Sequence, residues 1–332
     1  MQNPPSPSLA SIARHLGVST ATVSNALRGV GRVSPELAER IRRVAAEVRY
    51  VPDQVARALR TGRSTTIGLV VPDFGLPLFP DFAQAVERAA KRRGYGVLIA
   101  DSLGTAEGQA AEIANLAARG VDALVVIPVR GSRVGIDEHG VPVALIDSAT
   151  TLGNTASSDH RDAGRQLMGH LLALGHRDIL IFGGPQNSAV AVERVAGMRE
   201  RLDEAGIAAE IRHGPPSFEA GVQAARELDA GSATALACAY DAIAVGLVNG
   251  LAQRGIAIPR DISIAGIDGI AWATIVSPSL TSVRQDLAAI AEHAIAFVAG
   301  ETAEPRLLPV ELIVRASTAS PSPRPAPTGV PA

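Results

Sequence analysis

The sequence is poor in the residues on which several classes of protein depend. Its 332 residues include one cysteine, Cys238, and one lysine, Lys91, and 3% of them are aromatic. A single cysteine excludes an internal disulfide and fits a reducing cytosol, and within the apolar run TALACAY we expect a buried, inert thiol. The patterns G-x-x-x-x-G-K-[ST], G-x-G-x-x-G and H-E-x-x-H are absent, so no cofactor or metal is predicted.

The sequence also lacks segments that direct a protein into or across a membrane. Its first ten residues, MQNPPSPSLA, have neither the basic nor the apolar region of a signal peptide. No uncharged apolar stretch is long enough to span a bilayer. We therefore expect a cytoplasmic protein with no membrane partner. Residues 1–7 and 319–332, which are rich in proline, are predicted to be disordered tails.

Charge is divided unevenly along the chain, although the formal net charge is only −2. Residues 1–63 contain ten arginines and four acidic residues, which gives +6 there and leaves −8 for the remainder. A basic segment on an acidic body suits a protein that docks one end on phosphates and repels DNA elsewhere. A solvated charged surface is the alternative explanation.

Residues 8–29, SLASIARHLGVSTATVSNALRG, predict two short helices joined by a tight turn. Apolar residues recur at helical spacing from Leu9 to Leu16, Gly17 is expected to end the first helix, and Ser19 is a good N-cap for the second. An ordinary helical hairpin would explain these features too. The second helix, however, presents small polar groups that can approach base edges closely. These residues are Ser19, Thr20, Ala21, Thr22, Ser24 and Asn25.

Two further segments follow the hairpin. Ser34 and Pro35 predict the N-cap and first position of a third helix, and three helices can enclose a small core. After Pro52, the segment DQVARALRTGRS is too short to form a stable helix alone. We expect it to order only against a second copy of the chain or DNA, and such conditional order is a place where a switch can act.

From Thr65 onward, apolar strands alternate with amphipathic helices, which is the pattern of parallel sheets covered on both faces. Two such sheets predict two lobes with a cleft between them, where ligands bind at the carboxyl ends of strands. The predicted strands are 66–71, 97–100, 123–127, 143–146, 179–182, 235–239 and 262–266. The predicted helices are 80–93, 107–118, 161–174, 190–205, 218–228, 242–254 and 286–299.

Acidic and aromatic residues follow several of these strands and are candidates for a ligand site. They are Asp73, Phe74, Asp147, Tyr240, Asp241 and Asp268. Clustered carboxylates can accept hydrogen bonds from neighbouring ligand hydroxyls. A structural role is equally open for Asp241, which could cap the next helix, and for Asp147, which could hold a loop. Phe79, Phe218 and Trp272 could stack on an apolar ligand face or pack in the core.

Six motifs occur in a fixed order between Ser8 and Thr318. The first three are G-V-S-x-A-T-V-S-x-x-L, Y-x-P-x-x-x-A-R-x-L-R-x-G-R and I-G-L-V-V-P-D. The next three are L-x-A-L-G-H-R-D-I, P-x-D-I-S-I-A-G-I-D and P-S-L-T-S-V-R-Q. One fragment alone would be weak support. Together and in this order, they resemble the lactose-repressor (LacI/GalR) family of bacterial transcription regulators.

The resemblance implies an N-terminal all-α helix-turn-helix headpiece with a hinge helix, followed by an α/β, two-lobed, periplasmic-binding-protein-like core of two parallel doubly wound sheets. The chain would cross between the lobes near 157–160, 283–287 and 305–310. The expected parts are a tail (1–7), a DNA-binding domain (8–52), a hinge helix and linker (53–63), a core (64–318) and a tail (319–332). The N-lobe would comprise about 64–157 and 286–309, and the C-lobe about 158–283 and 310–318.

The resemblance also implies roles for single residues. In the core, Arg194 of R-x-x-G-M would donate its guanidinium fork to the ligand. In the hinge, Leu59 would wedge into the minor groove, helped by the small Ala56. In the second helix, the resemblance implies that Thr20, Ala21 and Asn25 contact bases of the DNA. It implies that Ser19, Thr22 and Ser24 contact phosphates.

The chain departs from the family pattern at several positions. Ile267-Asp268-Gly269 lacks one carboxylate and one aromatic ring, and Leu78 replaces a phenylalanine, so the stacking platform for a sugar is thinner. Asn25 stands where many relatives have arginine, which changes the expected base preference. Arg49 stands where many have glycine, which predicts strain at the end of the third helix.

The expected function is a ligand-controlled repressor, not an enzyme. Two chains would pair through their cores, so that two recognition helices enter successive major grooves of a pseudopalindromic operator in double-stranded DNA. A small polar effector, a sugar or sugar derivative, would set the angle between the lobes, with induction and corepression both open. The C-terminal tail lacks leucine heptads, so a homodimer is expected. The alternatives are a sugar-binding transport-type protein, whose export signal is missing, and an α/β enzyme.

Overall fold

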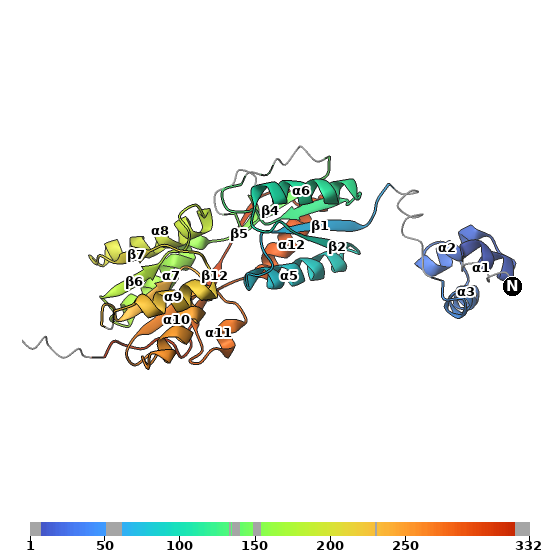
Figure 1. The fold of residues 1–332 in the computed structure, drawn as a ribbon. Helices are drawn as coiled ribbons and strands as arrows, with labels where there is room; N and C mark the ends of the chain where they lie inside the picture. The colour runs from blue at the N-terminus through green and yellow to red at the C-terminus, as the bar shows by residue number, and fades with distance from the viewer. Residues whose placement is uncertain are drawn as a thin grey trace, which may run out of the picture. The chain divides into compact units, whose positions relative to one another are not determined.

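The computed structural model describes residues 8–50, 62–132, 134, 140–148, 154–229 and 231–322. The chain divides into two compact units, residues 1–64 and 65–332, and each is considered by itself (Figure 1). Residues 51–61, which include Ala56 and Leu59, lie outside the described residues. The tail predicted at 1–7 and residues 323–332 lie outside them too.

The first unit contains three helices around a small apolar core. They are α1 (Leu9–Leu16), α2 (Thr20–Arg28) and α3 (Pro35–Glu47). As predicted, Gly17 ends α1 in the left-handed region with a φ of 70°, and the Ser19 side chain caps α2 by accepting from the backbone N–H of Thr22. The residues buried in this core are Ile12, Ala13, Val23, Ala26, Ala38, Ile41 and Ala45.

The turn after α3 contains the strain predicted from the sequence. Arg49 has a φ of 50°, in the left-handed region that side chains other than glycine rarely adopt. Its backbone N–H still donates to the carbonyl of Ala46, and Tyr50 donates to the carbonyl of Ala45. The backbone hydrogen bonds of the turn are made, so the energetic cost at Arg49 is the steric strain of its left-handed φ.

The second unit contains two sheets, and we call the part built on the first sheet the N-lobe. This sheet has six parallel strands in the order β11-β5-β4-β3-β1-β2. Alternate residues of the strands face α5 (Leu78–Arg92) and α12 (Leu287–Val298) on one side, and α6 (Ala106–Ala118) on the other. The strands are β1 (Thr66–Val71), β2 (Gly96–Asp101), β3 (Ala123–Val126), β4 (Val143–Ile146), β5 (Asn154–Ser158) and β11 (Arg306–Leu308).

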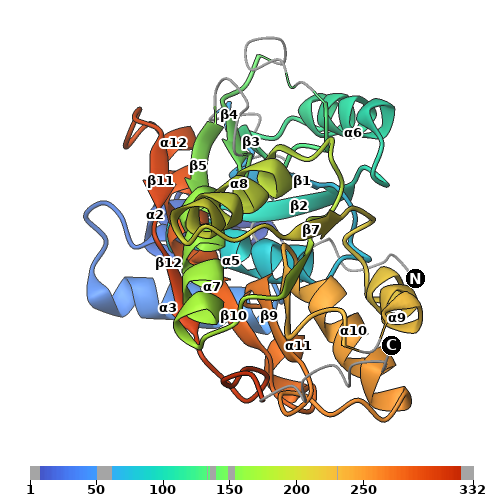
Figure 2. The ribbon, with the colours of Figure 1, turned by 90° about the vertical axis from the view of Figure 1, so that its left-hand side faces the viewer.

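The second sheet, with the helices that cover it, forms the C-lobe. Its strand order is β12-β10-β9-β8-β6-β7, and β12 alone runs antiparallel to its neighbour within this described sheet. One face packs against α7 (His160–Ala173) and α8 (Ala189–Glu204), the other against α9 (Phe218–Glu227) and α10 (Asp241–Gln253), as Figure 2 shows. The other elements are α11 (Trp272–Ile275), β6 (Ile179–Phe182), β7 (Glu210–Arg212), β8 (Ala235–Cys238), β9 (Ser263–Asp268), β10 (Thr281–Gln285) and β12 (Val310–Ile313).

The chain passes between the two sheets three times. The passages lie between β5 and α7, between β10 and α12, and between β11 and β12. The predicted two-lobed α/β fold is thus confirmed, and every predicted strand and helix of the core is found with ends within two residues of those expected. Five short strands were not predicted, namely β5, β7, β10, β11 and β12.

The disordered C-terminal tail was predicted to start at residue 319, which is too early. The backbone N–H of Ala319 donates to Ser263 Oγ over 3.1 Å, and its carbonyl is hydrogen-bonded to His176 Nε2 over 2.9 Å. Ser322 Oγ also donates to the carbonyl of Arg260. Residues 319–322 are therefore ordered against the C-lobe, because Ala319 and Ser322 find hydrogen-bond partners there, although the composition of this segment is typical of disorder.

Candidate functional site

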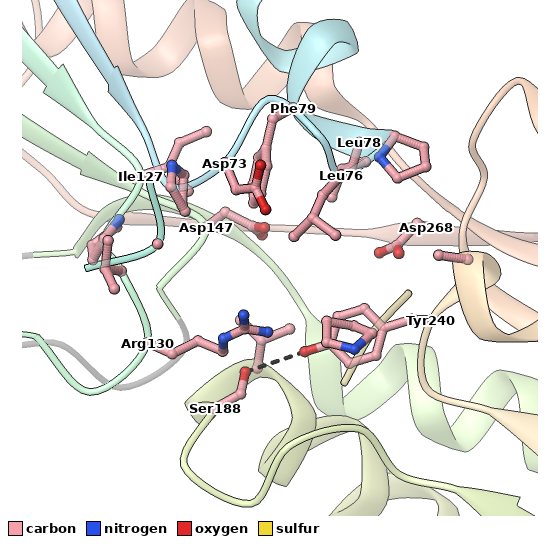
Figure 3. Close-up of a pocket in the computed structure, with 18 of the residues that line it drawn as sticks. Asp73, Leu76, Leu78, Phe79, Ile127, Arg130, Asp147, Ser188, Tyr240 and Asp268 are labelled. Carbon is pink, nitrogen blue, oxygen red and sulfur yellow. Dashed lines mark hydrogen bonds between the residues drawn. The ribbon is translucent and has the colours of Figure 1, made fainter. Parts of the chain in front are cut away.

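A cavity lies between the two lobes, where strands of both sheets end. Residues following β1, β3 and β4 line it from the N-lobe, and residues at the ends of β8 and β9 line it from the C-lobe. Its volume of about 120 Å³ corresponds to roughly four water molecules at about 30 Å³ each, which suits a small organic ligand. The polar residues of its lining are Asp73, Arg130, Asp147, Ser188, Arg194, Tyr240 and Asp268. Figure 3 shows all of these except Arg194 with labels.

Arg194 is fully buried on α8, and three groups hold its guanidinium. Nη2 donates to Asp268 Oδ1 over 2.7 Å, and Nη1 donates to the carbonyl of Ala239 over 2.6 Å. Nε donates to His160 Nδ1 over 3.3 Å. The guanidinium also lies 4.8 Å from the centroid of the Tyr240 ring, within cation–π distance. These contacts compensate the cost of burying the charge and fix the guanidinium at the cavity wall.

Asp268 ends β9 and connects the cavity to the strands that cross between the lobes. Its backbone has a φ of 138°, an unusual value for a residue with a side chain. Gln285 at the end of β10 donates to Asp268 Oδ1 over 3.0 Å, and Ser158 at the end of β5 donates to Gln285 Oε1 over 2.8 Å. Burial raises the pKa of Asp268, while the charge of Arg194 opposes that rise.

Asp147 and His160 form a buried contact between the lobes. Asp147 follows β4 with a φ of 55°, and its Oδ1 lies 2.9 Å from Nε2 of His160 at the start of α7. The geometry is poor for a regular hydrogen bond, and among the described residues neither atom has another hydrogen-bond partner. Burial would raise the pKa of Asp147, but His160 and, more weakly, Arg194 hold it below its ordinary value. The carboxylate therefore remains ionised at the cavity.

Tyr240 brings a hydroxyl group into the same wall. Its Oη is hydrogen-bonded to Ser188 Oγ over 3.2 Å. Burial raises the pKa of the phenol, so that Tyr240 carries its proton at neutral pH. Ser188 caps α8 through the backbone N–H of Ala191. The cavity thus combines two hydroxyl groups with three carboxylates and two guanidinium groups.

Asp241 does not line the cavity, although it follows the same strand. It also does not cap the helix through its side chain, because α10 begins at Asp241 itself. Its buried carboxylate accepts from the backbone N–H groups of Gly269 and Ile270 and from Ser282 Oγ. Burial, and less strongly the charge of Asp268, raises its pKa to about 7. Asp241 therefore holds the loop that follows β9.

Three predicted aromatic contacts also lie outside the cavity lining. Phe218 packs on the core between α9, α10 and the sheet. Phe74 and Trp272 are exposed, with 38% and 40% of the residue surface accessible, and neither lines the cavity. By contrast, the structure brings together Asp73, Phe79, Asp147, Arg194, Tyr240 and Asp268. Besides Phe79, the apolar part of the lining consists chiefly of aliphatic side chains. These are Leu76, Leu78, Ile127, Val129, Val190 and Ile270.

Three polar residues of the site were not identified from the sequence. Arg130 follows β3, so the strand-end rule that found Asp147 could have found it too. Ser188 was identifiable only as the N-cap of α8. His160 gave no local signal, because its role depends on the distant Asp147 and Arg194.

The candidate DNA-reading face lies on α2 of the first unit. Ser19, Thr20 and Ala21 are exposed, and the other three residues predicted for this face are partly exposed. Ser19 Oγ and Thr22 Oγ1 are 2.9 Å apart and hydrogen-bonded. Asn25 lies against Gly31, where an added Cβ would stand 3.2 Å from Asn25 Nδ2. Small side chains and an amide thus share one face of a helix whose opposite face is buried.

In the described part of the chain, no cluster of three or more histidine, cysteine or acidic side chains is arranged to hold a metal ion. No described helix is both long enough and apolar enough to cross a membrane.

The three-helix unit and the cleft define a class of protein, namely a DNA-binding headpiece joined to a two-lobed binding core. Residues 8–53 match the bacterial regulatory proteins of the lacI family, and residues 168–318 match the periplasmic binding protein-like domain. The ribose operon repressor of Haemophilus influenzae is 33% identical over 86% of this chain and 88% of its own length. The transcriptional regulator AscG of Escherichia coli is 30% identical over 94% and 98%. The chain therefore belongs to the lacI family of bacterial transcriptional regulators.

Solved structures agree with this assignment. The lac repressor dimer bound to operator and the anti-inducer ONPF matches with a TM-score of 0.81 and 27% identity, over 94% of this chain and 99% of that one. A LacI family regulator from Enterococcus faecium with bound ribose matches with a TM-score of 0.69 and 27% identity, over 77% and 100%. The headpiece and core predicted from the sequence are confirmed.

Proposed function

We propose that this regulator is a homodimeric repressor whose affinity for operator DNA is set by a sugar or sugar derivative in the cleft. The observation that carries the proposal is the cavity itself. Its walls come from both lobes, and its polar groups converge on one space. A ligand held by both lobes favours one angle between them, and only such a difference in affinity between two states can move an equilibrium.

The headpiece supports the DNA-binding half of the proposal. Through the small polar groups of α2, we assign base contacts to Thr20, Ala21 and Asn25, and phosphate contacts to the remaining three: Ser19, Thr22 and Ser24. Two such helices in a dimer would read two half-sites of a pseudopalindromic operator. The minor-groove role of Leu59 and Ala56 rests on the sequence alone, because both lie outside the described residues.

The cleft supports the ligand-binding half. Carboxylates of Asp73 and Asp147 can accept hydrogen bonds from hydroxyl groups, and Phe79 offers an aromatic face in a largely aliphatic wall. Arg194 is hydrogen-bonded to both Asp268 and His160, and Gln285 is hydrogen-bonded to Asp268. A ligand that binds the Arg194 guanidinium therefore also affects the crossing strands through Asp268 and Gln285. We propose that this network couples ligand binding to the lobe angle.

The same features favour a regulator over an enzyme or a transport protein. A DNA-reading headpiece serves no purpose in a transport protein, and a regulator acting on operator DNA works in the cytoplasm. We assign DNA binding to residues 8–52, hinge and linker to 53–63, and ligand binding with dimerisation to 64–318. Within the core, we assign the N-lobe and C-lobe to the ranges expected from the sequence.

The proposal is tested by removing the headpiece. Deleting residues 1–63 should abolish operator binding in a gel-shift assay and leave a folded core, because residues 65–332 form a compact unit with their own sheets. In a thermal-shift screen, the truncated core should still be stabilised by the ligand that acts on the full chain. Turnover of a substrate by the truncated core, or operator binding without the headpiece, would contradict the proposal.

A further inference from the structure

Arg130 differs from the other charged residues of the cleft. It follows β3, lines the cavity between the lobes, and also lines the wider outer part of the cleft. Its guanidinium points into the cavity in Figure 3. Among the described residues, no hydrogen bond or ion pair engages this side chain. A guanidinium group thus faces a ligand cavity with its donors available.

The other guanidinium group of the cleft, that of Arg194, differs from Arg130 in its burial and its partners. Arg194 is fully buried and already bound to Asp268, Ala239 and His160. Its charge is matched inside the protein, so it holds the wall in place. The charge of Arg130 has no such match, and it is exposed to whatever enters the cleft.

Three groups beside Arg130 favour an anion at its guanidinium, although the carboxylates of Asp73 and Asp147 line the same cavity. Ser188 lies beside it in Figure 3, and Tyr240 Oη is hydrogen-bonded to Ser188 Oγ. One of these two hydroxyl groups donates to the other, which leaves one O–H available to donate toward a ligand. Ser188 is also the N-cap of α8, a helix of 16 residues with no acidic residue in its first turn. The positive end of that helix dipole adds to the potential near Arg130. Asp268 lies at the other end of the cavity (Figure 3).

We infer that the natural ligand carries an anionic group, a phosphate or a carboxylate, and that Arg130 binds it beside Ser188 and Tyr240. Arginine presents a rigid fork of donors that matches both groups in a bidentate manner. The hydroxyl groups of the same ligand would meet the carboxylates of Asp73 and Asp147. The ligand is thus a sugar phosphate or a sugar acid. A neutral sugar would leave the charge of Arg130 without a partner. The inference rests on the proposed function, because it assigns the ligand class of the same cleft.

The first test uses inorganic phosphate and the full chain. Isothermal titration at constant ionic strength should show phosphate binding that Arg130→Gln weakens by roughly 10- to 100-fold, the range expected for a lost hydrogen bond to a charged group. The matched control is Arg88→Gln, since Arg88 is exposed on α5 and does not line the cleft. All three proteins keep the arginine-rich headpiece, so binding there cancels. Equal phosphate affinity in all three, or no phosphate binding by the unaltered chain, would overturn the inference.

The second test identifies the anionic group and separates the inference from the proposed function. In thermal-shift measurements, matched sets of a neutral sugar, its phosphate ester and its sugar acid are compared on the unaltered chain and Arg130→Gln. One anionic member should raise the melting temperature of the unaltered chain alone. A neutral sugar that stabilises both proteins equally, with no gain from its anionic forms, overturns the inference and leaves the repressor intact. Failure of the unaltered chain to bind any operator from a random library contradicts the repressor itself.

Discussion

Gly164 on α7 meets the backbone of Arg194 on α8. A Cβ added at Gly164 would stand 2.0 Å from the carbonyl oxygen of Arg194, and one added at Gly197 would stand 1.9 Å from the carbonyl oxygen of Arg161. The two helices therefore touch backbone to backbone at the turn that carries Arg194. The place of its guanidinium in the cleft depends on this close crossing.

Gly164→Ala should push the two helices apart. Overpacking against backbone costs about 1–3 kcal/mol of the free energy of unfolding, measurable by urea denaturation. Gly169→Ala on the same helix is the matched control, because its Cβ would meet only the flexible Arg201 side chain at 3.4 Å. That variant should be neutral or gain up to about 1 kcal/mol from better helix propensity. Similar effects of the two substitutions would contradict the role of the crossing.

Most of the fold could be predicted because its strands are buried and apolar. β1, β4 and β6 are continuous apolar runs covered on both faces, so their ends are visible in the sequence. β5, with the sequence NTASS, and β11 and β12, on either side of Pro309, were missed. Short polar strands and segments next to proline are held in place by pairing with neighbours, and hydrophobic periodicity does not record that pairing.

The site was predictable to the extent that strand ends meet at one edge of a sheet. That rule found Asp73, Asp147 and Asp268, and the family resemblance supplied Arg194. The strand-end rule does not predict which of these side chains point into the cavity. Unusual backbone angles at Asp147 and Asp268 set their directions, whereas Asp241 turns toward the backbone N–H groups of the loop after β9.

The raised pKa of Asp241 predicts a pH dependence of stability. In the folded chain this pKa is about 7, against an ordinary value of 3.8. Between these values the folded state binds the proton more tightly than the unfolded state, so the free energy of unfolding should fall as pH rises from about 4 to about 7. Asp268, whose pKa is also raised, contributes with the same sign. Asp147, whose pKa is lowered, contributes below that window.

Asp241→Asn tests this account, because it removes the charge and keeps the shape. Urea denaturation at several pH values should show a weaker decline between pH 4 and 7 than in the unaltered chain. Glu87→Gln, at an exposed position on α5, is the control and should leave the decline unchanged. An equal decline in the Asp241 variant would show that another group causes it.

Arg49→Gly should stabilise the three-helix unit. The residue has a φ of 50°, and relieving a left-handed conformation in a residue with a side chain is worth about 1 kcal/mol. Hydrogen–deuterium exchange of α1, α2 and α3 in the full chain measures the effect. Arg43→Gly removes the same charge from the interior of α3 and should instead cost about 1 kcal/mol. Faster exchange in the Arg49 variant would show that the turn is not strained.

Asn25 predicts which base pair the recognition helix prefers at one operator position. Its amide can pair with N6 and N7 of adenine, whereas arginine in that place would pair with O6 and N7 of guanine. Asn25→Arg should therefore move the preference from A·T to G·C, by roughly the 1–3 kcal/mol of one bidentate contact. Selection of binding sites from a random library, at one salt concentration, measures the change.

Asn25→Ala is the control for this exchange, because it should lose the preference for adenine without gaining one for guanine. Asn25 lies against Gly31, so its amide is already placed by the turn that follows α2. If Asn25 met only phosphate or water, both variants would change affinity uniformly across sequences. An unchanged base preference at that position in the Arg variant would therefore exclude direct readout by Asn25.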